Sequence, residues 1–127
     1  MSMSVAAIQD EISEAIKAHS TWKLHLRTGT ISGRLETPSR DICCDDKCKF
    51  GQWLHSPSTE AGMAGDANYV RAKKLHSEFH QFAGAIAQKI ERGDLDAAKH
   101  DLDLGKPFDE KTKELTKHMM VWRKSLQ

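Results

Sequence analysis

Apolar residues recur every three or four positions along most of this chain, which is the spacing of helices with one buried face. Between Val5 and Leu26 the apolar positions are Ile8, Ile12, Ala15, Ile16, Trp22 and Leu26. The longest regular stripe comprises Tyr69, Ala72, His76, Phe79, His80, Ala83, Ile86, Ala87 and Ile90. The pattern therefore predicts a helix near the N-terminus and a long one over residues 69–90.

A third stripe runs through Leu95, Ala98, Leu102, Phe108, Leu115, Met119, Trp122 and Leu126, and Pro107 should break or kink it. Glycine, proline and hydroxyl residues predict a connector over residues 28–42, and a short helix is expected from Lys47 to His55, before the Ser56-Pro57 break. No segment alternates like a strand. We expect an all-α, antiparallel four-helix bundle in which one short helix carries the cysteines, forming a single domain over residues 1–127.

The amino-acid composition limits which partners and which cellular compartment we expect for this chain. The 19 basic and 18 acidic residues are spread evenly and give a net charge of +1, so we expect neither nucleic acid nor a membrane surface as partner. The N-terminus lacks the pattern of a signal peptide, and no stretch approaches the ~20 apolar residues of a membrane span. Three clustered cysteines are typical of a reducing compartment, so we expect a cytoplasmic protein.

Two histidines, His76 and His80, are spaced i and i+4 and lie on the apolar face of the long predicted helix. His19 lies on the apolar stripe of the first helix. Burying a polar ring without a partner costs about 2 to 7 kcal/mol, so three such rings on core faces indicate a shared partner. Each ring alone would be explained by a backbone hydrogen bond, whereas together with a thiol they match the ligands that zinc prefers.

Among the sulfurs, Cys48 has the best position for a ligand, because it begins the short helix that Phe50, Trp53 and Leu54 would anchor in the bundle. Gly51 would allow close approach to a neighbouring helix, and a helix N-terminus favours the thiolate. Cys43 and Cys44 are adjacent and are interpreted as bystander thiols. The four remaining histidines are expected at the surface: His25, His55, His100 and His118.

The segments H-S-T-W-K at 19–23, C-K-F-G-Q-W-L at 48–54 and H-S-E-F-H at 76–80 resemble the chemoreceptor zinc-binding (CZB) family of bacterial signalling domains. The resemblance covers the chain from about Ile8 to its end. It implies that His19, Cys48, His76 and His80 hold one Zn²⁺ ion. Trp22, Phe50, Gly51 and Trp53 are expected to pack around them.

The resemblance also implies a function. CZB domains are often homodimers and are fused to chemoreceptors or diguanylate cyclases, and members respond to zinc and to oxidants such as hypochlorous acid. We therefore expect a sensory domain without enzymatic activity, with Cys48 as the redox-reactive thiol. In some oxidant-sensing relatives an acidic residue follows the cysteine motif, but residues 54–59 contain none, so Glu60, Asp45 or Asp46 would have to take that place.

Two alternatives remain open from the sequence. The first is a small adaptor protein in which zinc is purely structural. The second is a di-iron bundle of the hemerythrin-like kind, which needs inward-facing carboxylates on the helices. Glu78 lies beside the His76 and His80 face, not on it, which disfavours the di-iron site.

Overall fold

The computed structural model describes residues 4–126 and contains helices but no strands within that range. The helices are α1 (Val5–Ser20), α2 (Trp22–Ser32), α3 (Ser39–Ile42), α4 (Lys49–Leu54), α5 (Pro57–Met63), α6 (Ala67–Glu91), α7 (Leu95–Asp101) and α8 (Pro107–Ser125). The predicted all-α class is confirmed. None of the described helices is both long enough and apolar enough to cross a lipid bilayer.

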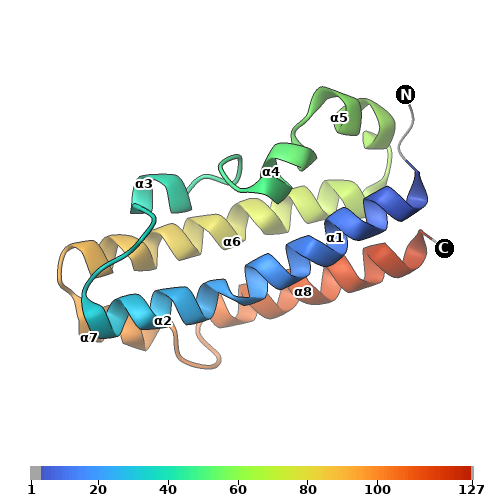
Figure 1. The fold of residues 1–127 in the computed structure, drawn as a ribbon. Coiled ribbons are helices and arrows are strands. Elements are labelled where there is room, and N and C mark those ends of the chain that lie inside the picture. Colours follow the sequence, from blue (N-terminus) through green and yellow to red (C-terminus); the bar gives the residue numbers. More distant parts are fainter. Residues whose placement is uncertain (1–3, 127) are drawn as a thin grey trace.

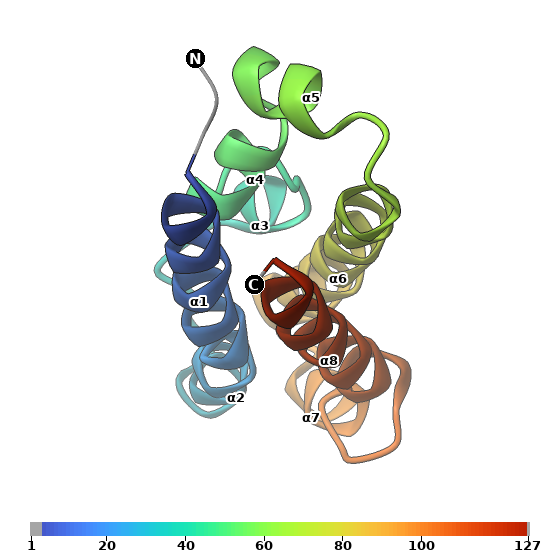
Figure 2. The ribbon, with the colours of Figure 1, turned by 90° about the vertical axis from the view of Figure 1, so that its right-hand side faces the viewer.

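The chain runs back and forth along one axis in four passes (Figure 1). Helices α1 and α2 form the first pass, the short helices α3, α4 and α5 form the return, α6 is the third, and α7 and α8 form the last. Seen end-on, α4 lies across the space between α1 and α6, and α8 lies opposite it (Figure 2). The predicted antiparallel bundle is thus present, with its second pass divided into short helices.

The first helix and the connector that follows it differ from the sequence prediction. The first helix is interrupted at Thr21, where the hydroxyls of Ser20 and Thr21 donate to the carbonyls of Lys17 and Ala18. Such side-chain bonds compete with the helical backbone ladder. The second helix then continues to Ser32, so the predicted connector over 28–42 was wrong at both ends, because α3 also lies within it.

The Ser56-Pro57 pair was predicted to stop a helix, and α4 does end just before it. It also starts α5, which the apolar pattern did not predict. The Ser56 hydroxyl accepts a hydrogen bond from the Thr59 N–H, and Pro57 occupies the first helical position, where its missing N–H costs nothing. The predicted break near Pro107 is confirmed, since α7 ends at Asp101 and α8 begins at the proline.

The helix α6 supplies the central surface of the core. All nine residues of its predicted stripe are buried: Tyr69, Ala72, His76, Phe79, His80, Ala83, Ile86, Ala87 and Ile90. Helices α8, α3, α7, α2 and α4 pack around α6. Two imidazoles therefore lie among hydrocarbon side chains, and the bundle needs a partner for their nitrogen atoms.

Gly51 allows the cysteine loop to fold back onto α4. A Cβ atom at this position would lie 1.5 Å from the Asp45 carbonyl oxygen and 3.2 Å from Cε1 of His76. The close approach predicted for Gly51 is therefore made chiefly to its own preceding loop and only secondarily to a neighbouring helix. Any larger residue must displace the loop that carries Cys48.

Gly51→Ala should lower the free energy of unfolding of the metal-free protein by about 1–3 kcal/mol, because the added methyl group overlaps backbone atoms that have no room to move. Gly62→Ala is the matched control, since nothing lies within 4 Å of a Cβ atom there and alanine favours a helix. Urea denaturation followed by circular dichroism measures both. Equal stability of the two variants would contradict the packing described for Gly51.

Candidate metal centre

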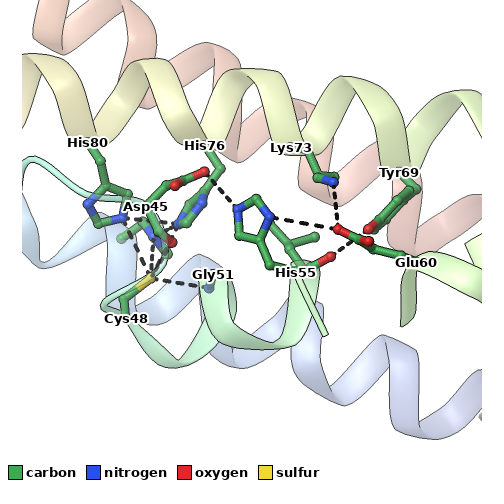
Figure 3. A network of polar contacts seen from close by, with 11 residues as sticks. Asp45, Cys48, Gly51, His55, Glu60, Tyr69, Lys73, His76 and His80 are labelled. Atoms are coloured by element: carbon green, nitrogen blue, oxygen red, sulfur yellow. Dashed lines mark hydrogen bonds and ion pairs between the residues drawn. The ribbon is translucent and has the colours of Figure 1, made fainter. Parts of the chain in front are cut away.

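Four side chains distant in sequence converge at one point in the bundle. The imidazoles of His19, His76 and His80 and the thiol of Cys48 each offer one donor atom, and all four donors lie within 4.8 Å of one another. His19 comes from α1, His76 and His80 come from α6, and Cys48 comes from the loop that enters α4. Figure 3 shows the sulfur of Cys48 facing the rings of His76 and His80.

The donor atoms lie close enough together to share one ion. Nε2 of His76 lies 2.9 Å from Nε2 of His19 and 3.0 Å from Nε2 of His80. Sγ of Cys48 lies 3.3, 3.6 and 3.9 Å from Nε2 of His76, His80 and His19. Nitrogen and sulfur donors bound tetrahedrally at zinc distances would be separated by about 3.3–3.6 Å. The observed distances scatter on both sides of this spacing, so shifts of a few tenths of an ångström would bring the four donors to the geometry of a four-coordinate zinc site.

Backbone carbonyls orient two of the rings. Nδ1 of His19 lies 2.7 Å from the Ala15 oxygen, and Nδ1 of His80 lies 2.9 Å from the Ile42 oxygen. A carbonyl oxygen only accepts hydrogen bonds, so each Nδ1 must carry the proton and donate it. In a neutral ring this leaves Nε2 unprotonated, with a free lone pair. Both lone pairs point into the cluster, as metal-binding histidines require.

His76 alone cannot donate a hydrogen bond to both of the other rings. Its Nε2 faces the lone pairs of both His19 and His80, and a single proton there serves only one of them. Its buried Nδ1 has no hydrogen-bond partner among residues 4–126. Lone pairs that converge on one point with few protons between them attract a cation. The four donor atoms therefore suit a zinc ion in their chemical type as well as in their spacing.

Burial keeps the three rings uncharged. Burial lowers the pKa of His19 to about 4 and that of His76 to about 2. Burial also lowers the pKa of His80, although the Ile42 carbonyl opposes the shift. At neutral pH all three imidazoles are therefore neutral and able to donate a lone pair to a metal.

Cys48 occupies the N-cap position of α4, where its sulfur accepts a hydrogen bond of 3.3 Å from the Gly51 N–H. Burial raises the pKa of the Cys48 thiol, and the backbone N–H groups of Gly51 and Phe50 only partly oppose this. In the metal-free protein, burial therefore raises the pKa of the Cys48 thiol more than the start of the helix lowers it. A cation in the cluster would reverse the balance, since metal coordination deprotonates thiols.

Aromatic residues surround the cluster. Phe50 is buried and presents its ring at 5.8 Å from that of His19 and 5.1 Å from that of His76. Trp53 stacks on Phe50 at 5.8 Å and also contacts Trp122 of α8. Trp22 is half-buried and lines a cavity of about 210 Å³ together with His19, Cys48 and Phe50. Phe50 thus lies directly against the histidine rings, while Trp53 lies behind Phe50. The cavity gives small solutes access to the sulfur.

The three acidic residues considered as partners for the cysteine have different surroundings. Asp45 lies in the loop before α4, and its carboxylate binds Nε2 of His55 at 3.0 Å (Figure 3). Glu60 bonds Lys73 on α6 at 3.3 Å, and Asp46 is exposed. Of these three, Asp45 is the one whose charge contributes to the raised pKa of Cys48.

The other chemistry-bearing residues lie outside the cluster. His25, His55 and His100 are exposed as predicted, whereas His118 is half-buried and its Nε2 donates to the Asn68 carbonyl at 2.9 Å. The Glu78 carboxylate binds Lys111 of α8 at 3.1 Å, so it does not face His76 and His80. Sequence reasoning missed the orienting carbonyls of Ala15 and Ile42, because a backbone acceptor has no residue-specific pattern.

Comparison with known proteins agrees with this geometry. A search of curated proteins and one of solved structures each gave no match. The model of the chemoreceptor zinc-binding domain (CZB) matches residues 19–87, a segment that begins at His19 and contains the other three donors. CZB is a zinc-binding sensory family, and the match spans more than half of the chain. The protein is therefore a member of the chemoreceptor zinc-binding domain family.

Proposed function

We propose that the chain is a sensory zinc-binding domain in which His19, Cys48, His76 and His80 hold one Zn²⁺ ion. The observation that supports this best is the convergence of four donors within 4.8 Å, with the two outer rings fixed by backbone carbonyls. When bound, zinc would supply a positive charge that keeps the Cys48 sulfur as a thiolate at neutral pH. Four protein donors leave no position for a catalytic water, which argues for regulation and against hydrolysis.

The cluster connects parts of the chain that lie far apart in sequence. His19 lies two residues before Thr21, where the first pass is interrupted, and Cys48 lies in the irregular loop between α3 and α4. Both are joined at the cluster to the rigid central helix α6. Loading the site would therefore hold the α1–α2 junction and the cysteine loop against α6, and emptying it would release both. This is the change that we propose as the signal of zinc availability.

Oxidants offer a second way to release the loop. The cavity beside Trp22 opens onto Cys48, which is only partly buried. Hypochlorous acid would transfer its oxygen and proton to the thiolate, giving the sulfenic acid Cys–SOH and chloride, so the sulfur is oxidised and the chlorine reduced by two electrons. The oxidised sulfur is a weaker donor, and the cysteine loop loses its attachment. The other three donors would remain on their helices.

We further propose that the output is a chemotaxis or cyclic-di-GMP signalling protein, with the domain acting as a homodimer in the cytoplasm. This part depends on family membership. In the last helix Met119 and Trp122 are buried in the core, while Met120 and Val121 are exposed. The buried residues complete the bundle and are not available to a partner.

Removal of the thiol should test the ligand set. Native mass spectrometry of the wild-type protein should show one zinc per chain. Cys48→Ala should lower the zinc affinity by more than the ~100-fold that is typical of losing an outer-shell contact, because a direct donor is lost. Cys44→Ala is the matched control, since this thiol lies outside the cluster. Full affinity in Cys48→Ala, or two irons per chain, would contradict the site.

Zinc affinity should rise with pH by about tenfold per unit between about pH 7 and 8. Burial lowers the pKa values of the three imidazoles, so they are largely neutral in this range, whereas the raised pKa of Cys48 means that one proton leaves when zinc binds. Competition titrations with a chelator at several pH values measure the slope. A slope of two or more protons, or of none, would contradict these protonation states.

Stoichiometric hypochlorous acid should release zinc from the loaded wild-type protein, as measured with a chromogenic chelator. Oxidation of Cys48 should be found in the same sample by peptide mass spectrometry. Cys43→Ala/Cys44→Ala should release zinc to the same extent, because those thiols are not donors. If zinc stays bound while Cys48 is unmodified, the purely structural zinc of a small adaptor protein is the better description.

A further inference from the structure

The bundle carries a second group of sulfur atoms that the zinc site does not use. Sγ of Cys43 and Sγ of Cys44 lie 3.2 Å apart at the end of α3. Both thiols also approach the same acceptor, the Arg40 carbonyl oxygen, at 3.3 and 3.5 Å. Neighbouring side chains in an extended segment point to opposite sides, whereas these two sulfurs lie on one side of the chain. They form a vicinal dithiol.

The surroundings hold this arrangement in place. A Cβ atom on Gly84 of α6 would lie 2.6 Å from Cβ of Cys43, so the glycine lets the end of α3 rest directly on the central helix. Both cysteines are half-buried and free of disulfides. A hydrogen bond with Cys43 raises the pKa of Cys44 and keeps that thiol protonated at neutral pH. The dithiol is accessible to small reagents but fixed at its backbone.

A disulfide does not suit this pair. The Cα atoms of neighbouring residues joined by a trans peptide are about 3.8 Å apart, whereas disulfides usually need about 4.4–6.8 Å. The sulfurs would also have to close from 3.2 Å to about 2.05 Å. A single soft atom placed between the sulfurs bonds to both without that closure. Soft thiolates prefer soft, polarisable centres, and trivalent arsenic binds two of them at once.

We propose that Cys43 and Cys44 form a second thiol site that captures one trivalent arsenic centre, as arsenite or an arylarsenoxide. Two As–S bonds form. From arsenite, two As–OH bonds break, each hydroxyl takes up one thiol proton and leaves as water, and the third As–OH bond remains. From an arylarsenoxide, the As=O bond breaks, and its oxygen takes up both thiol protons and leaves as one water. Arsenic stays trivalent, so neither an oxidant nor a reductant is needed. The capture does not depend on zinc, because neither sulfur belongs to the His19, Cys48, His76 and His80 cluster.

Phenylarsine oxide with the zinc-loaded full chain tests this site by intact-mass spectrometry. The wild-type protein should form one adduct with loss of one water, and 1,2-ethanedithiol should remove it. Cys48→Ala should form the same adduct. Cys43→Ser and Cys44→Ser should each weaken the apparent affinity by about a hundredfold or more, because the second bond is then no longer intramolecular.

The same spectra report zinc, which Cys43→Ser and Cys44→Ser should retain at one ion per chain. No adduct on the wild-type protein, or an adduct that persists in both serine variants, would overturn the proposal. An adduct lost only in Cys48→Ala would assign the capture to the metal-centre thiol instead. Failure of zinc binding with normal arsenical capture would refute the proposed zinc site and leave the dithiol site standing.

Discussion

The structure depends on how three imidazole rings and a thiol are accommodated inside a hydrocarbon core. Burying one unpaired polar group costs several kcal/mol, and the cluster buries the rings of His19, His76 and His80 together. Backbone carbonyls satisfy the outer nitrogen of His19 and of His80. The inner nitrogens face one another, and a cation placed between them would balance their converging lone pairs. In the proposed site, zinc binding would therefore be coupled to folding.

The arrangement of these donors explains the shape of the bundle. The second of its four passes is not a long helix but three short ones with a loop, which allows Cys48 to approach His76 and His80 of α6. Gly51 lets the loop fold tightly, and Phe50 and Trp53 fix α4 against the core. The least regular part of the chain is thus the part that carries the thiol. A change at that sulfur would move a loop without unfolding the central helix.

Much of the fold could be predicted from the sequence, because helical periodicity reports which residues share a face. The spacing of His76 and His80, and the phase of His19 with Ile12, are enough to assign three donors to core faces. The structure brings these donors together with Cys48, and their role as ligands stays a prediction. Periodicity could not reveal the interruption at Thr21, which arises from local side-chain bonds, or α5, whose start depends on Ser56 capping. Nor could it show that Cys43 and Cys44 point to one side, because that depends on the turn after α3.

The coordination sphere of the bound metal tests the central claim most directly. X-ray absorption at the zinc edge of the loaded wild-type protein should show four donors, three nitrogens at about 2.0–2.1 Å and one sulfur at about 2.3 Å. The nitrogen shell should show the multiple-scattering pattern of imidazole. A shell without sulfur, or one with two or more sulfurs, would contradict the proposed ligands His19, Cys48, His76 and His80.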